Sequence, residues 1–224
     1  MLAIVDTETT GLPRSRMSDG SDDFSEVRAT EAAILLLTDR YEETSRHVFK
    51  FRLSDEMYNN ASPDMKKALE INGYDHSLEG PWGKAPIMGT PLAKNEWHNI
   101  AGLLRKRTLV AQNVAFDAGV LKAELLRYQL CTEVSFPWTR RVFDVLGLCQ
   151  FLRLHYDIRN AKGWSSASIQ DVYPAMGGPE MEAHRAMADA ERIIYLLKVF
   201  NDTFTTADEV YSVKEQRRSD PELG

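Results

Sequence analysis

The 224-residue sequence is poor in several features that mark particular classes of protein. It has two cysteines, Cys131 and Cys149, whose spacing fits no zinc or redox motif, so we expect reduced structural thiols. It has no apolar run long enough to cross a bilayer, and Asp6 interrupts the N-terminal apolar stretch, unlike a signal peptide. We therefore expect a cytoplasmic protein that does not bind membranes.

The sequence also lacks an excess of positive charge. Its net charge of −6 argues against a protein that holds nucleic acid through a broad basic surface. It does not exclude an enzyme that holds a polyanion through metal ions, because bound dications supply positive charge locally. What is present is an ordinary composition, 43% hydrophobic and 27% charged, at a length that suits one domain with a full core.

The apolar pattern predicts that the chain opens with three strands. We expect them at residues 2–6, 30–39 and 44–53. The residues between the first two, 13–28, are polar and rich in Ser, Asp and Gly, which predicts a loop, and the short polar link at 41–43 predicts a hairpin. Strands joined by such local turns pair in antiparallel fashion.

The rest of the chain alternates between helical patterns and one short apolar strand at 108–113. We expect an irregular connection at 73–91 and helices at 63–72, 92–106, 115–130, 144–155, 165–175 and 183–200. An antiparallel start followed by alternating helix and strand predicts a single α/β domain that gains parallel strands. We assign residues 1–204 to this domain and residues 205–224 to a polar tail.

Asp6 and Glu8 stand where the first strand ends, in the stretch LAIVDTETTG at 2–11. Residues two apart on a strand point to the same side, so the two carboxylates lie together despite their repulsion. One explanation is that the strand simply emerges into solvent there. The turn that follows at 9–11 offers backbone N–H groups beside the acids, which favours a site for a phosphate or a sugar.

Two further acids lie on apolar helix faces. Asp117 falls in the first turn of the helix at 115–130, beside the apolar stripe, where it either complements the helix dipole or belongs to a site. Asp189 lies on the apolar face of the helix at 183–200, where an unpaired carboxylate would cost several kcal/mol. Because no Lys or Arg is evident on that face, we expect a distant base or a metal ion to compensate Asp189.

His184 precedes Asp189 by five residues, a spacing that carries little weight by itself. Five residues turn an ideal helix by about 140°, so the two side chains would not share a face. We therefore expect His184 in the loop or first turn, free to approach whatever Asp189 binds.

If the four acids converge, they form an oxygen-rich site that suits Mg²⁺ or Mn²⁺ better than zinc. Two such ions, roughly 3.5–4 Å apart, are the usual device for in-line displacement at a phosphodiester. A neutral histidine nearby would take the proton of the attacking water, since its unperturbed pKa lies near neutrality.

Three stretches resemble the motifs of the DEDDh 3′→5′ exonucleases, in the family's order: DTETTG at 6–11, NVAFD at 113–117 and HRAMAD at 184–189. The family includes the proofreading subunit of bacterial replicative polymerase, ribonuclease T and oligoribonuclease. The resemblance covers most of residues 1–200. It implies a ribonuclease H-like fold, an α/β mixed five-stranded sheet of three antiparallel and two parallel strands flanked by helices.

The resemblance also implies the metal centre and the base. Asp6, Glu8, Asp117 and Asp189 would hold two divalent ions, Mg²⁺ or Mn²⁺, with Asp6 bridging both. His184 would be the general base. All five residues would be catalytic in this family.

The expected substrate contacts come from the same resemblance. Thr9 would meet the terminal 3′-OH through its backbone, Leu12 would wedge against the last base, and Asn113 and Phe116 would line the nucleotide site. The sequence departs from the family at Gln112, where a histidine is common, and at 71–73, which read Ile-Asn-Gly instead of an apolar residue, His and Gly. These departures concern substrate preference, not the metal ligands.

The implied activity is metal-dependent release of nucleoside 5′-monophosphates from the 3′ ends of single-stranded nucleic acid, with DNA favoured. The alternatives are an RNA-trimming exoribonuclease of the same fold, a catalytically silent nucleic-acid-binding module, and a subunit that docks on a polymerase or helicase. Partners in keeping with the family are single-stranded DNA or RNA 3′ ends, a second copy of the chain, and a polymerase or replisome.

Overall fold

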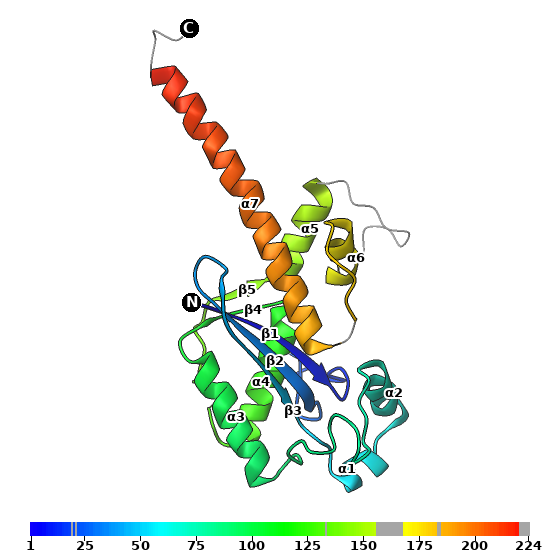
Figure 1. The fold of residues 1–224 in the computed structure, drawn as a ribbon. Coiled ribbons are helices and arrows are strands. Elements are labelled where there is room, and N and C mark those ends of the chain that lie inside the picture. Colours follow the sequence, from blue (N-terminus) through cyan, green and yellow to red (C-terminus); the bar gives the residue numbers. More distant parts are fainter. Residues whose placement is uncertain (19, 21, 133, 156–167, 183–184, 220–224) are drawn as a thin grey trace.

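The computed structural model describes the chain except for residues 19, 21, 133, 156–167, 183–184 and 220–224. Its centre is one five-stranded sheet in the order β3-β2-β1-β4-β5 (Figure 1). The strands are β1 (Leu2–Thr9), β2 (Ala29–Leu37), β3 (Glu43–Lys50), β4 (Thr108–Ala111) and β5 (Val142–Asp144). The helices are α1 (Asp55–Asn59), α2 (Pro63–Ile71), α3 (Pro91–Leu104), α4 (Val114–Arg127), α5 (Val145–His155), α6 (Ile169–Ala175) and α7 (Ala186–Ser219).

The directions of the strands confirm the predicted mixed sheet. β1, β2 and β3 pair in antiparallel fashion, and β4 and β5 extend the sheet in parallel from β1. β1 pairs with β2 along its whole length, whereas its pairing with β4 covers only Leu2 to Ile4. The second half of β1 therefore extends past the parallel side of the sheet.

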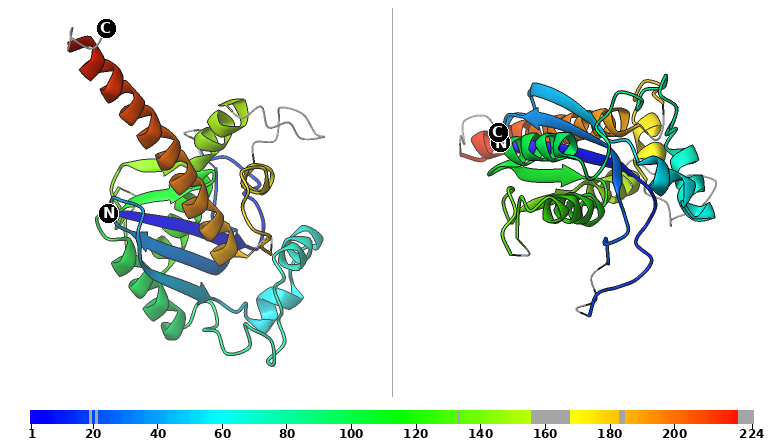
Figure 2. Two further views of the ribbon diagram at one scale, coloured as in Figure 1. Left: turned by 45° about the horizontal axis from the view of Figure 1, so that its top comes forward. Right: turned by 90° about the horizontal axis from the view of Figure 1, so that it is seen from below.

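Helices cover both faces of the sheet and make two apolar layers. Ala3 and Val5 pack in the layer formed with α3 and α4, and Ile4 packs in the layer formed with α5, α6 and α7. α7 crosses its face of the sheet (Figure 2) and contacts β1 and β2. By the alternation along a strand, Asp6 and Glu8 follow Ile4 toward the α7 side.

Two short elements differ from the prediction. α1 spans five residues and β5 spans three, and neither was expected from the local pattern. Segments this short offer too few positions for a period to be read.

α7 begins at Ala186 and extends past residue 205, where we expected a tail to begin. Its far half projects away from the sheet (Figure 1). The division of the chain at residue 204 stays a prediction. No helix in the described part of the chain has both the length and the apolar character needed to cross a bilayer.

Candidate active site

Three of the four predicted acids meet on the α7 side of β1. Asp6 and Glu8 come from the strand, and Asp189 comes from the first turn of α7. One carboxylate oxygen from each lies within 4.8 Å of the others. These three residues, called the acid cluster below, are close enough for one cation to bind them all.

Asp117 reaches the same place from the opposite face of the sheet. It lies in the first turn of α4, is 3% exposed, and accepts a hydrogen bond of 2.8 Å from the Thr7 hydroxyl. Thr7 points to the α4 side because it alternates with Asp6 and Glu8. Since the pairing with β4 ends at Ile4, α4 and α7 both reach the second half of β1. Asp117 and the acid cluster border one cavity of about 220 Å³.

Burial and mutual repulsion disfavour the ionised form of these acids. Burial, followed by the charges of Asp117 and Asp189, holds the pKa of Asp6 well above its ordinary value. Burial, followed by the charges of Asp189 and Glu31, raises the pKa of Glu8 to about 7. Burial raises the pKa of Asp117 to about 7 against the hydrogen bond from Thr7, which lowers it. A bound cation would therefore stabilise the ionised forms of these carboxylates.

Glu31 is a fifth acid near the site that the sequence reading missed. It lies on β2 directly across from Glu8, is 4% exposed, and its carboxylate is 3.6 Å from the Lys50 ammonium. Its charge raises the pKa of both Asp6 and Glu8. The register between β1 and β2 is the signal that would have found it, because cross-strand partners lie side by side.

Asp189 has a local cation partner, although the sequence pattern placed no Lys or Arg on that face of the helix. The Arg192 guanidinium, three residues further along α7, pairs with the Asp189 carboxylate. The second terminal nitrogen of Arg192, Nη2, donates to the Met181 backbone carbonyl at 2.6 Å. Residues three apart are neighbours on a helix, and the long Arg side chain reaches back along the apolar face.

Arg185 is a second cation that the sequence reading missed. Its guanidinium packs on the turn after α2, where Nη1 donates to the Asn72 carbonyl at 3.3 Å, and its charge lowers the pKa of Glu8. A side chain at Gly73, which has a φ of +62°, would place its Cβ 2.7 Å from Arg185 Nη1. The backbone conformation therefore favours glycine there, whereas the flexible end of the Arg185 side chain could shift to admit a Cβ.

Asn72, at the position where the family commonly has histidine, holds the end of β1. Its side-chain amide donates to the Thr9 carbonyl at 2.8 Å. Through Asn72, the turn after α2 connects Arg185 to the strand that carries Asp6 and Glu8. His184, the predicted base, lies outside the described residues.

The predicted substrate contacts fall in two places. Asn113, held in the left-handed region at φ 59°, and Phe116 border the cavity of the acids, together with Gln112. The side-chain amide oxygen of Gln112 (Oε1) accepts from the Ile169 backbone N–H at 3.1 Å, at the start of α6. Thr9 is buried at the end of β1, and Leu12 lies beyond it, in a neighbouring pocket.

Comparison with known proteins identifies the family and the fold. A model of the exonuclease family named for RNase T matches residues 86–197, half of the chain. No curated protein matches. The chain is similar to E. coli exonuclease I in complex with a dT13 oligonucleotide, with a TM-score of 0.62 and 19% identity over 88% of this chain and 40% of that one.

Two further solved structures show the same fold. A product-bound exonuclease I gives a TM-score of 0.65 and 16% identity over 94% of this chain and 46% of that one. E. coli exonuclease I with a dA16 oligonucleotide gives a TM-score of 0.61 and 20% identity over 91% of this chain and 43% of that one. The chain thus spans less than half the length of these proteins.

Proposed function

This chain belongs to the RNase T exonuclease family, and from that premise we propose that it is a metal-dependent 3′→5′ exonuclease acting on single-stranded nucleic acid. The observation that carries the proposal is the acid cluster, whose three carboxylate oxygens lie within 4.8 Å of one another. We propose DNA as the favoured substrate and nucleoside 5′-monophosphates as products. The similar structures of E. coli exonuclease I with dT13 and dA16 support this choice.

The donor set fits divalent cations. Carboxylate oxygens are the ligands that Mg²⁺ and Mn²⁺ prefer, and the raised pKa values of Asp6 and Glu8 show negative charge that the protein compensates only in part. Asp6, Glu8 and Asp189 would hold one ion, and Asp117, across the same cavity, would help to hold a second. When bound, the ions would activate the attacking water and stabilise the leaving oxygen.

The protein's own residues orient this centre. Asp6 and Glu8 point to the same side of β1. The Arg192 guanidinium holds the Asp189 carboxylate, and the Thr7 hydroxyl holds that of Asp117. We propose that His184 takes the proton of the attacking water, on the strength of the motif that it shares with Asp189.

Thr9, Asn113 and Phe116 are proposed to hold the terminal nucleotide. Asn113 and Phe116 border the acid cavity, and Asn72 fixes the backbone of Thr9 at its edge.

The test is digestion of 5′-labelled single- and double-stranded DNA and RNA oligonucleotides side by side in Mg²⁺ and Mn²⁺. We expect stepwise shortening of single-stranded DNA from its 3′ end, and loss of product on chelation. Asp6→Asn and Asp189→Asn should lower the rate by a factor on the order of 10³ or more, because each removes a metal ligand. Circular dichroism should show the fold unchanged.

The matched control is Glu56→Gln, which removes an exposed carboxylate on α1 and should cleave like the wild type. His184→Ala should slow turnover at saturating metal far more than it weakens oligonucleotide binding. Preferential digestion of RNA would assign an exoribonuclease instead. Binding without product in either metal would assign a silent binding module.

A further inference from the structure

A path of hydrogen bonds joins the two sides of the acid cluster through the turn after α2. Asn72 Nδ2 donates to the Thr9 carbonyl at 2.8 Å, and Thr9 directly follows Glu8 on β1. The Asn72 carbonyl in turn accepts from Arg185 Nη1 at 3.3 Å. The Arg185 carbonyl accepts from the Asp189 backbone N–H at 3.0 Å. The path therefore leads from Glu8 to Asp189 without passing through the sheet.

We propose that Asn72 and Arg185 form a brace that holds Glu8 and Asp189 close enough to share a divalent ion, against the repulsion between their charges. In this proposal the two are positioning residues and not metal ligands. Without the brace, the ion itself would have to order the acids, and part of its binding free energy would be lost. The inference rests on the proposed function, in which the acid cluster binds a divalent ion, and adds residues that set the affinity for that ion.

The end of β1 is the part of this strand that the sheet holds least regularly. Its pairing with β4 stops at Ile4, and its register with β2 shifts between Glu8 and Thr9. Such a shift bends a strand and changes the direction of the side chains beside it. The Thr30 hydroxyl donates to the Glu8 carbonyl at 3.1 Å, and Asn72 donates to the carbonyl of the next residue. The direction of the Glu8 side chain therefore depends on these side-chain hydrogen bonds as well as on strand pairing.

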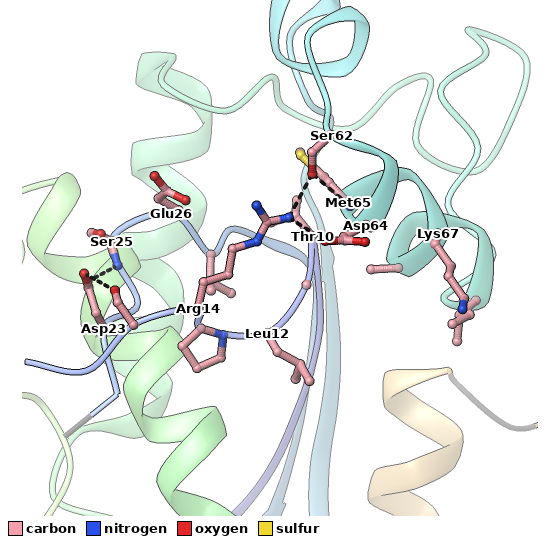
Figure 3. A pocket seen from close by; sticks show the side chains of 16 residues that line it. Thr10, Leu12, Arg14, Asp23, Ser25, Glu26, Ser62, Asp64, Met65 and Lys67 are labelled. Atoms are coloured by element: carbon pink, nitrogen blue, oxygen red, sulfur yellow. Dashed lines mark hydrogen bonds and ion pairs between the residues drawn. The ribbon is translucent and has the colours of Figure 1, made fainter. Parts of the chain in front are cut away.

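Helix α2 gives the brace a fixed support. Leu69 on this helix is 2% exposed and packs in the apolar layer formed with α3 and α4. At the start of the helix, Arg14 donates to the Ser62 hydroxyl at 3.0 Å and to the Asp64 carboxylate at 3.1 Å. Figure 3 shows these bonds beside the pocket of about 680 Å³ between α2 and the segment that follows β1. Both ends of α2 are thus tied to β1 or to the segment after it, and its last turn presents Asn72 from a held position.

The Arg185 side chain acts on the acid cluster in two ways. Its Nε donates to the Glu182 carboxylate at 3.1 Å while its Nη1 donates to the Asn72 carbonyl, so the guanidinium bridges two acceptors. Its charge also lowers the pKa of Glu8. In metal binding these two effects oppose each other, because a nearby cation repels the ion. A test of the brace must therefore keep the positive charge at position 185.

The test measures the Kd of the folded full-length chain for Mn²⁺ alone, by titration followed through the electron paramagnetic resonance signal of free Mn²⁺. Asn72→Ala removes the bond to the Thr9 carbonyl without changing the charge. Arg185→Lys keeps the charge but loses the planar fork that reaches two acceptors. Each variant should raise the Kd roughly two- to tenfold, the net worth of one hydrogen bond. The double variant should raise it no further than the larger single effect, because both changes interrupt the same path.

The matched control for Asn72→Ala is Asn60→Ala. Asn60 ends α1 as Asn72 ends α2, with a φ of −89° against −78°, and its side chain has no hydrogen-bond partner in the described part of the chain. The control for Arg185→Lys is Arg40→Lys, an exposed residue in the turn between β2 and β3. Both controls should bind Mn²⁺ like the wild type. Asp6→Asn, which removes a proposed ligand, should lose the measured binding and so identify the acid cluster as its site.

The outcomes separate the brace from the proposed function. A wild type that binds no Mn²⁺, or binds it no better than Asp6→Asn, overturns both. If the wild type binds Mn²⁺ and degrades oligonucleotides, but Asn72→Ala or Arg185→Lys binds the ion as its control does, the brace alone is overturned. Effects that multiply in the double variant also overturn it. Weaker binding in both single variants, with no added loss in the double variant, supports the brace, and if no oligonucleotide is cleaved only the proposed activity fails.

Discussion

The molecule buries carboxylates in two regions, which differ in how many cations lie beside the acids. Glu124 on α4 is 1% exposed, yet two guanidinium groups neutralise it: Arg28 at 2.7 Å and Arg127 at 3.0 Å. The backbone N–H of Ala29 adds a hydrogen bond of 3.2 Å. One buried negative charge thus has two cations and a backbone donor.

The acid cluster has the opposite balance. Its three carboxylates lie within 4.8 Å of one another, and in the described part of the chain only Asp189 forms an ion pair, with Arg192. Arg185 acts on Glu8 as a more distant charge. Both regions are acidic and buried, so burial alone does not identify a functional site. The excess of acids over cations distinguishes the acid cluster, because its carboxylates are disfavoured as anions and a bound cation would stabilise them.

The largest expected difference between the two regions is in how removal of one carboxylate changes the free energy of unfolding. Glu124→Gln should lower the free energy of unfolding by about 3 kcal/mol, because it leaves two partly buried guanidinium groups, Arg28 and Arg127, without their anion. Asp6→Asn should leave it unchanged or raise it, because one of several repelling charges is removed. Urea denaturation without dications measures both. An equal loss in the two variants would contradict the distinction.

The next effect is stabilisation by metal. A dication at a hundred times its Kd should raise the free energy of unfolding by about 2.7 kcal/mol in the wild type, since it binds only the folded chain. Glu124→Gln should show the same gain and Asp6→Asn should lose most of it. Thermal unfolding with and without Mg²⁺ measures this shift. A gain that persists in Asp6→Asn would place the bound ion elsewhere.

The effect that is smallest per step of one pH unit is the dependence of stability on pH without metal. The pKa of Asp117 is about 7 in the folded protein and near 4 when unfolded, so between these values the folded state binds more protons. Stability due to this group is therefore present below pH 4 and declines toward pH 7, by at most about 1.4 kcal/mol per pH unit. Glu8, whose pKa is also about 7, adds a decline of the same sign.

The measurement is the difference in unfolding free energy between the wild type and Asp117→Asn at pH 5, 6 and 7. The wild type should lose stability relative to the variant as pH rises, and saturating Mg²⁺ should abolish the trend. A relative gain toward pH 7 would show that Asp117 is stabilised as an anion by the protein alone.

Regular spacing predicted four of the five strands, whereas the fifth strand and the meeting of the acids at one site were implied only by the resemblance to the exonuclease family. The alternation along β1 put Asp6 and Glu8 on one side, and the apolar face of α7 put Asp189 against the sheet. The roles of these acids as metal ligands, and of His184 as base, stay predictions, as do the substrate contacts of Thr9, Leu12, Asn113 and Phe116.

Local patterns could not reveal what depends on register and on long side chains. Glu31 joins the site through its pairing with Glu8, which depends on how β1 and β2 align. Arg192 reaches Asp189 through a side-chain conformation, and Arg185 finds its place through a turn more than a hundred residues away. The pocket beside the acids is likewise a property of two segments, not of either one.

The order of the cluster's residues along the chain has a consequence for synthesis. Asp6 and Glu8 leave the ribosome before the other strands of the sheet, but Asp189 follows only after the whole sheet has been translated. A nascent or truncated chain that ends before α7 carries the first two acids without the third. The complete cluster therefore reports that translation has passed α7 and that its N-terminal end has docked on β1.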